Sequence, residues 1–205
     1  MAEEQMLTDM QFDVLREIGN IGSGHAATAL AKMLNMKIDI KVPQAVVCDF
    51  NYLVQMVGGE ERLVIGILLQ LSDDVDGMMM FIMDLPSAYA LLRKLMFSDL
   101  KEEDSLGEMH MSALQEIGNI ITGAYLSSLS DLTSLKINAS IPYLSIDMAA
   151  AILSVPAIEF GKLGDKAVMI ETEFDLDETQ ELNGYFLLIP TMDSYSRIMS
   201  SLGIQ

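Results

Sequence analysis

The sequence predicts an α/β (α+β) fold made by internal duplication, in which two long helices pack on a largely antiparallel sheet and a pseudo-twofold axis relates the halves. The pentapeptide EIGNI begins at Glu17 and again at Glu116, 99 positions later. The same offset joins Pro43 to Pro142. Each half also reads as a long helix, a few short strands and a closing helix. Three strands make a poor core alone, so we expect both halves to share one sheet.

The elements of the first half follow from its apolar patterns. Apolar residues recur with a helical period at its start, and polar and apolar residues then alternate as in a strand. Two apolar runs flank the turn-rich sequence SDDVDG, which predicts a hairpin, and Pro86 suits the first turn of a helix. The expected elements are a helix over about 8–35, a β-rich segment over 36–50, hairpin strands over 61–71 and 77–85, and a helix over 86–97.

The second half is expected to repeat this order, with one helical insert. Its expected elements are a helix over about 108–132, a strand over 135–142, a helical insert over 145–153, strands over 165–177 and 183–192, and a closing helix over 193–203. A polar linker separates the halves, which we place at about 8–98 and about 107–205. We expect residues 1–205 to form a single domain of two repeats.

Composition limits the classes of function. The 205 residues include 30 acidic and 12 basic ones, so the formal net charge is −18. Such a chain lacks the basic surface that nucleic acids and anionic membranes attract. The acidity favours a partner with a basic patch, or it serves only to keep a Met-rich chain in solution, and both interpretations stay open. We expect a cytoplasmic protein, because no signal peptide or membrane-length apolar run is evident and Cys48 is the single cysteine.

Both long helices carry the same polar face. The positions that fall within roughly 80° of one another on a helix are Asp13, Glu17, Asn20, Gly24, Ala27 and Ala31 in the first half, and Ser112, Glu116, Asn119, Gly123, Leu126 and Ser130 in the second. Val14, Ile18 and Ile21 are expected to face the core instead. Gly19 and Gly118 weaken a helix, so their presence in both copies predicts tight packing. Exposed Glu and Asn are common on helices, but two copies in register favour a functional role.

Other candidate sites are weaker. The sequence GNIGSG lacks the Lys-Ser/Thr of a phosphate-binding loop and lies within a predicted helix. Two histidines, His25 and His110, and one cysteine make a zinc site improbable. SDDVDG has Met83 where a calcium loop needs its closing glutamate, so a turn is the better interpretation.

The repeated pattern Asp/Ser-x3-Glu-x2-Asn-x22-Pro resembles that of the CheC/CheX/FliY family of bacterial chemotaxis phosphatases. It reads Asp13, Glu17, Asn20, Pro43 in one copy and Ser112, Glu116, Asn119, Pro142 in the other. The resemblance covers essentially the whole chain. It is greatest with the CheC branch, because two motif copies are present and 205 residues leave no room for an additional switch domain.

The resemblance implies a hydrolase that removes the aspartyl phosphate of the response regulator CheY. Glu17 with Asn20, and Glu116 with Asn119, would form two catalytic sites. A carboxamide can orient the attacking water without repelling the phosphoryl oxygens, and the Glu would pair with a lysine of the regulator. We expect no cofactor or metal on this chain, since CheY supplies Mg²⁺. The supporting motif residues would be Asp13, Ser112, Pro43 and Pro142.

The family also implies a second partner, the receptor deamidase CheD. By resemblance the insert over 145–153 would dock it, with Asp147 as the main contact. From the residues alone, an ordinary packed helix is equally consistent with this segment. The alternative function is a non-enzymatic adaptor that sequesters CheD or acts at the flagellar switch. The oligomeric state stays open, and a monomer is one expectation.

Overall fold

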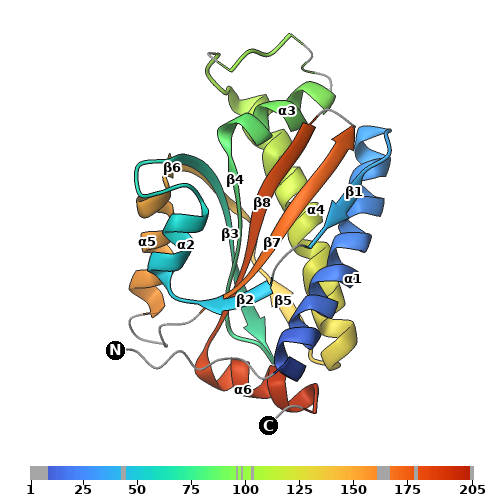
Figure 1. The fold of residues 1–205 in the computed structure, drawn as a ribbon, viewed down its shortest axis with the longest axis vertical. Helices are drawn as coiled ribbons and strands as arrows, with labels where there is room; N and C mark the ends of the chain where they lie inside the picture. The colour runs from blue at the N-terminus through green and yellow to red at the C-terminus, as the bar shows by residue number, and fades with distance from the viewer. Residues whose placement is uncertain are drawn as a thin grey trace.

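The described part of the chain contains six helices and eight strands, and the strands form one sheet (Figure 1). A computed structural model describes residues 9–42, 45–95, 97, 99–102, 104–160, 167–177 and 180–203. The first half contains α1 (Asp9–Leu34), β1 (Asp39–Lys41), β2 (Ala45–Cys48), α2 (Phe50–Met56), β3 (Leu63–Asp73), β4 (Gly77–Asp84) and α3 (Leu85–Leu95). The second contains α4 (Glu108–Thr133), β5 (Ile137–Ala139), β6 (Tyr143–Met148), α5 (Ala149–Phe160), β7 (Ala167–Asp177), β8 (Gln180–Pro190) and α6 (Met192–Ser201). The predicted fold class is confirmed.

The sheet joins the halves by exchanging strands between them. Its eight strands follow the order β1-β7-β8-β4-β3-β5, with β2 also on β7 and β6 also on β3. All pairings are antiparallel, and the central pair, β4 and β8, places Phe81 opposite Phe186. The short strands β1 and β2 therefore extend the long hairpin of the second half, while β5 and β6 extend that of the first. Neither half completes its own part of the sheet.

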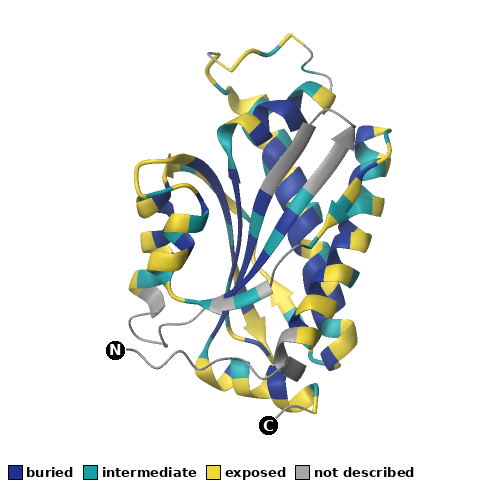
Figure 2. Cartoon of the chain, viewed as in Figure 1, coloured by how far each residue is buried: buried dark blue, intermediate teal, exposed yellow. Residues whose placement is uncertain are grey.

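Helices cover both faces of this sheet, so its strands are apolar on both sides (Figures 1 and 2). The core under α1, α3, α4 and α6 contains the strand residues Ile65, Ile67, Met79, Phe81, Ile170 and Phe186. The core under α2 and α5 contains the strand residues Val64, Met80, Ile82, Met169 and Leu187. Successive side chains of a strand point to opposite faces of the sheet. Because helices cover both faces here, the side chains on both faces are apolar. This explains the continuous apolar runs in the sequence.

The two long helices lie side by side in opposite directions (Figure 1). Tyr125 of α4 meets Gly22 of α1 at their contact, where a Cβ on the glycine would lie 2.6 Å from the tyrosine ring. Helices α1 and α4 end symmetrically, because Asn35 and Ser134, again 99 positions apart, adopt left-handed φ values of 51° and 57°. Such a residue after the last turn commonly ends a helix. The duplication therefore extends to the helix ends.

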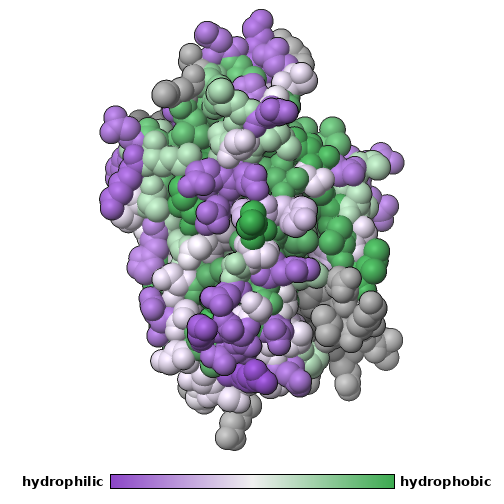
Figure 3. Space-filling view, turned by 180° about the vertical axis from the view of Figure 1, so that it is seen from behind, coloured by the Kyte–Doolittle hydropathy of each residue, from purple (hydrophilic) through white to green (hydrophobic). Residues whose placement is uncertain are grey.

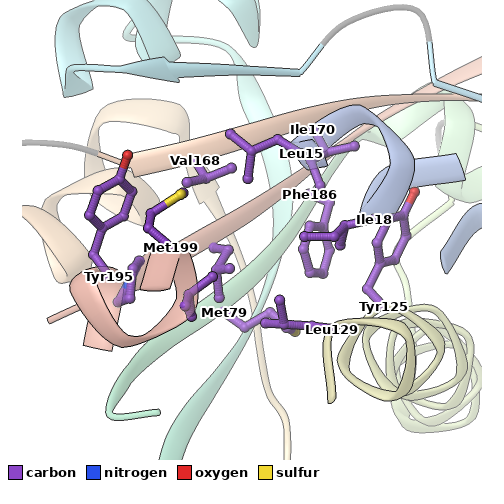
Figure 4. A pocket seen from close by; sticks show the side chains of 13 residues that line it. Leu15, Ile18, Met79, Tyr125, Leu129, Val168, Ile170, Phe186, Tyr195 and Met199 are labelled. Atoms are coloured by element: carbon purple, nitrogen blue, oxygen red, sulfur yellow. The ribbon is translucent and has the colours of Figure 1, made fainter. Parts of the chain in front are cut away.

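A small apolar void lies beneath α1 and α6 (Figure 4). Figure 4 shows side chains from α1, α4, α6 and the central strands converging on it, among them Leu15, Tyr125 and Met199. Its volume of about 10 Å³ holds at most a single water, and its lining is apolar. It is a packing defect rather than a ligand site. Among the described helices, none is long and apolar enough to cross a membrane.

Two expected elements differ from the structure. The segment predicted to be β-rich over 36–50 contains β1 and β2, but α2 begins at its last residue and had not been predicted. The helical insert expected over 145–153 begins only at Ala149, because 143–148 form β6 against β3. Leu144 and Ile146 alternate as half-buried residues facing the core, which favours a strand. Helix α5 then continues to Phe160.

The buried face of α1 also differs from the expected stripe. Leu15, Ile18, Gly22 and Ala26 are buried, whereas Ile21 is only half-buried. Small residues let the helix lie close to its neighbours, so the buried face turns toward Gly22 and away from Ile21. This rotation leaves the opposite, polar face more completely exposed than the sequence pattern indicated.

Candidate functional site

Two Glu/Asn pairs lie on the outer faces of α1 and α4. The first pair is Glu17 and Asn20, and the second pair is Glu116 and Asn119. All four residues are exposed. Residues three apart on a helix place their Cβ atoms about 5–6 Å apart, so each carboxylate lies beside its carboxamide. Within the described residues, no hydrogen bond or ion pair engages these four side chains. Both pairs can therefore meet an external partner.

Glycines seat the opposite side of each helix on the sheet. A Cβ on Gly118 would overlap the Ile67 side chain of β3, with Cγ2 at 3.0 Å. A Cβ on Gly19 would lie 3.1 Å from both Ile170 of β7 and Val42. The neighbouring side chains would have to shift to admit a methyl group at either position, so the expected tight packing is confirmed. Each Glu/Asn pair therefore stands on a helix that is fixed from behind.

Short polar residues stiffen the turn after each asparagine. The hydroxyl of Ser23 donates to the carbonyl of Asn20 at 2.9 Å. The hydroxyl of Thr122, at the equivalent position of the second half, donates to the carbonyls of Gly118 at 2.7 Å and Asn119 at 3.3 Å. Hydroxyl groups often bond to preceding helix carbonyls in this way. The backbone that carries both asparagines is thus held similarly in the two halves.

The motif residues around the pairs have different surroundings. Asp13 is exposed and forms an ion pair with Arg16 at 3.6 Å, while Ser112 at the equivalent position is exposed. The carbonyl of Pro142 accepts a hydrogen bond of 2.6 Å from the side chain of Gln115, which directly precedes Glu116. Pro43 lies outside the described residues. Gln115 was not singled out from the sequence, because Arg16 occupies its position in the other copy.

Asp147 lies in strand β6 rather than in a helix, which corrects the expected insert. It is exposed and pairs opposite Val64 of β3. Its carboxylate accepts a hydrogen bond from the backbone N–H of Met148 at 2.8 Å. The helix that follows, α5, exposes Val155 and Ile158, which are 46% and 67% accessible. Asp147 thus precedes an apolar helix face and does not lie on it.

The Glu/Asn pairs do not include the three other residues considered from the sequence, Cys48, His25 and His110. Burial, together with the nearby Asp49 carboxylate, raises the pKa of the Cys48 thiol to about 12. His25 is exposed at the contact of α1 with α4, with Nδ1 3.4 Å from the Ser128 hydroxyl. His110 accepts a hydrogen bond from the Gly107 N–H at 3.1 Å. Among the described residues, no group of three His, Cys, Asp or Glu could hold a metal ion.

Comparison with known proteins identifies the family. A model of the CheC-like family matches residues 10–47 and 109–146, which contain both Glu/Asn pairs. The CheY-P phosphatase CheC of Bacillus subtilis is 40% identical over 200 residues, which cover 96% of each protein. The chain belongs to the CheC-like family. This confirms the family expected from the sequence, and the expected class of enzyme, a phosphatase, is that of this relative.

Solved structures share the fold. Thermotoga maritima FliY superposes with a TM-score of 0.76 at 22% identity, covering 97% of this chain and 98% of that one. A chain of the CheX–CheY–BeF3–Mg²⁺ complex from Borrelia burgdorferi gives a TM-score of 0.51 at 18% identity, covering 82% of this chain and 95% of that one. At these identities the likeness concerns the fold alone.

Proposed function

We propose that this CheC-like protein hydrolyses the aspartyl phosphate of the chemotaxis response regulator CheY at two sites. The observation that carries the proposal is the pair of exposed Glu/Asn units, each in the same position of a helix whose other side is fixed against the sheet. The name of the B. subtilis relative supports the choice of substrate. The chain's charge of −18 also suits attraction to a basic patch on a partner.

Asn20 and Asn119 orient the attacking water in this proposal. An amide both donates and accepts hydrogen bonds, so it can hold a water through its oxygen or its nitrogen. Because the amide is neutral, it does not repel the phosphoryl group. Phosphoryl transfer depends mainly on positioning and electrostatic stabilisation, and the partner brings the phosphorylated aspartate with its Mg²⁺ and lysine. Neither asparagine acts as a nucleophile.

Glu17 and Glu116 position the partner. Each carboxylate lies one turn before its asparagine on an exposed helix face. It would form an ion pair with a lysine of the regulator, which aligns the helix so that the neighbouring amide faces the phosphorus. Loss of the glutamate should therefore weaken docking, while loss of the asparagine should remove the water's partner.

The test follows phosphate loss from phosphorylated CheY with wild type, Asn20→Ala, Asn119→Ala and the double variant. We expect each single variant to keep part of the activity and the double variant to have none above CheY alone. Asn51→Ala is the matched control, because Asn51 is also exposed but lies on α2, across the sheet. An inactive wild type would refute the function, and an inactive single variant would refute two independent sites.

We further propose that the outer face of α5 binds the deamidase CheD. Residues 151, 154, 155 and 158 recur at helical spacing on this face, and Val155 and Ile158 are exposed although they are large and apolar. Buried Ile152 and Leu153 hold the opposite face against the sheet. Asp147 would contribute a charged contact beside the start of the helix.

Binding of purified CheD distinguishes this role from catalysis. The double variant Val155→Ser/Ile158→Ser should bind CheD at least 10-fold more weakly and retain hydrolysis of phosphorylated CheY, because α5 lies across the sheet from α1 and α4, which carry the Glu/Asn pairs (Figure 1). Asp147→Lys should weaken CheD binding as well. If CheD binds equally to all variants, α5 is not its docking surface. Strong CheD binding by a wild type without phosphatase activity would favour the adaptor function.

A further inference from the structure

An apolar groove lies beside the second Glu/Asn pair. It is bounded by Met111 and Gln115 of α4 and by residues 140–144, and encloses about 660 Å³. Ile141 and Tyr143 border it and are 80% and 79% accessible, the largest exposures among the large apolar residues of the described chain. Figure 3 shows hydrophobic patches between hydrophilic ones on the side of the molecule that faces away in Figure 1. An exposed apolar patch on so acidic a protein favours binding.

The loop that carries these side chains is held at both ends. The Ser140 hydroxyl accepts from the N–H of Gln70 at 3.0 Å, and the Ser140 N–H donates to the Gln70 carbonyl at 2.9 Å. The Pro142 carbonyl is held by Gln115 of α4. Ile141 and Tyr143 are therefore presented by a fixed backbone, which lowers the entropy cost of docking.

The groove is continuous with the second pair. Met111, Gln115 and Asn119 form one i, i+4 ridge of α4, so the wall of the groove leads directly to the catalytic amide. Met111 and Asn119 are eight residues apart, or about 12 Å along the helix. A standard interface covers about 800 Å² on each partner, equivalent to a disc of about 16 Å radius. A protein that places its phosphoaspartate at Asn119 must therefore cover the groove too.

The described residues around the first pair differ from those of the groove. At the positions equivalent to Gln115, Ser140 and Ile141, the first half has Arg16, Lys41 and Val42. Val42 is half-buried and packs toward Gly19, whereas Ile141 is exposed. The groove has no charged residue in its lining, while its counterpart carries two basic residues. The two sites thus offer different surroundings to the same substrate.

We propose that this groove is a docking site for an apolar side chain of the phosphorylated response regulator, and that Ile141 and Tyr143 set the affinity of the second site alone. The inference rests on the proposed phosphatase function. Binding in the groove buries apolar area of the regulator beside the reacting phosphate, while Asn119 acts on the water. Since the groove contacts substrate and transition state equally, it should lower KM and leave kcat unchanged.

The experiment isolates each site. Asn20→Ala leaves only the second site, and Asn119→Ala leaves only the first. Ile141→Ser/Tyr143→Ser is introduced into both, and KM and kcat are measured with phosphorylated CheY. In the Asn20→Ala background we expect KM to rise about 10-fold with kcat within about 2-fold, and in the Asn119→Ala background no change beyond about 2-fold. Met192→Ser, at an exposed methionine of α6, is the control and should change neither KM nor kcat.

Two results would overturn the proposal. One is an unchanged KM in the Asn20→Ala background, and the other is an equal rise of KM in both backgrounds, which would indicate a general effect on the fold.

Binding to CheY activated with beryllofluoride and Mg²⁺ separates this proposal from the catalytic one. Wild type that binds but does not hydrolyse would refute the phosphatase function. If the groove variant then binds as tightly as wild type, the docking site is refuted independently.

Discussion

Replacing Gly22 with alanine tests the contact that joins the two motif helices. The added methyl would lie 2.6 Å, 2.9 Å and 3.0 Å from three ring carbons of Tyr125. That ring cannot easily move, because it is 1% accessible and stacks on Phe186 with centroids 4.2 Å apart. Its hydroxyl also lies 3.2 Å from that of Thr172. The methyl must therefore displace α1 or break these contacts.

The expected cost follows from three effects. Overpacking costs about 1–3 kcal/mol, and loss of the Tyr125–Thr172 hydrogen bond would add about 1 kcal/mol. Alanine offsets about 1 kcal/mol through its higher helix propensity. We expect the free energy of unfolding to fall by about 2 kcal/mol, which lowers the Tm by about 4–8 °C for a protein of this size.

Gly24→Ala is the matched control in the same helix. No atom lies within 4 Å of the position its Cβ would take, so this variant should gain about 1 kcal/mol. Urea denaturation followed by circular dichroism measures both variants. The argument is refuted if Gly22→Ala is as stable as Gly24→Ala. A double-mutant cycle with Tyr125→Ala should also show coupling of at least about 1 kcal/mol, because removing the ring makes room for the methyl.

Three further predictions concern packing and ionisation. Gly118→Ala should lower the free energy of unfolding by about 1 kcal/mol, since its Cβ would overlap Ile67, while Gly123→Ala, with no neighbour within 4 Å, should raise it by about 1 kcal/mol in the same urea assay. With a pKa of about 12, Cys48 should react with iodoacetamide at pH 8 at least 10-fold more slowly in the native protein than in urea, and equal rates would contradict this. Burial also raises the pKa of Tyr125 to about 12, so Cys48 and Tyr125 both ionise first in the unfolded state. Their contribution to the free energy of unfolding should be constant below about pH 8 and fall between about pH 9 and pH 12. Urea denaturation should show a less stable protein at pH 10.5 than at pH 8, and equal or greater stability at pH 10.5 would contradict this sign.

The local features of this fold could be predicted from the sequence. The repeat located both long helices, and the turn SDDVDG located the hairpin of β3 and β4. The exposure of Glu17 and Glu116 followed from helical periodicity. These features depend on neighbouring residues, so a single sequence reveals them.

Features that depend on distant contacts were not predictable in the same way. Nothing near residues 39–48 indicates that they pair with β7 of the other half. Gly22 has Ile121 as its counterpart, so the duplication gave no signal for its contact with Tyr125. Asp147 was assigned to a helix because small residues follow it, yet pairing with β3 decides its conformation. Tertiary contacts overrode local preference at this position.

The exchange of strands between the halves indicates an origin by fusion of two similar subunits. Each long hairpin, β3–β4 and β7–β8, accepts two short strands from the opposite half. This is the connectivity of a domain-swapped homodimer whose two subunits have been fused end to end. A chain cut between α3 and α4 should accordingly yield two fragments that fold only together, each complementing the sheet of the other. Fusion would fix the stoichiometry of such a pair and leave its two motif helices free to diverge.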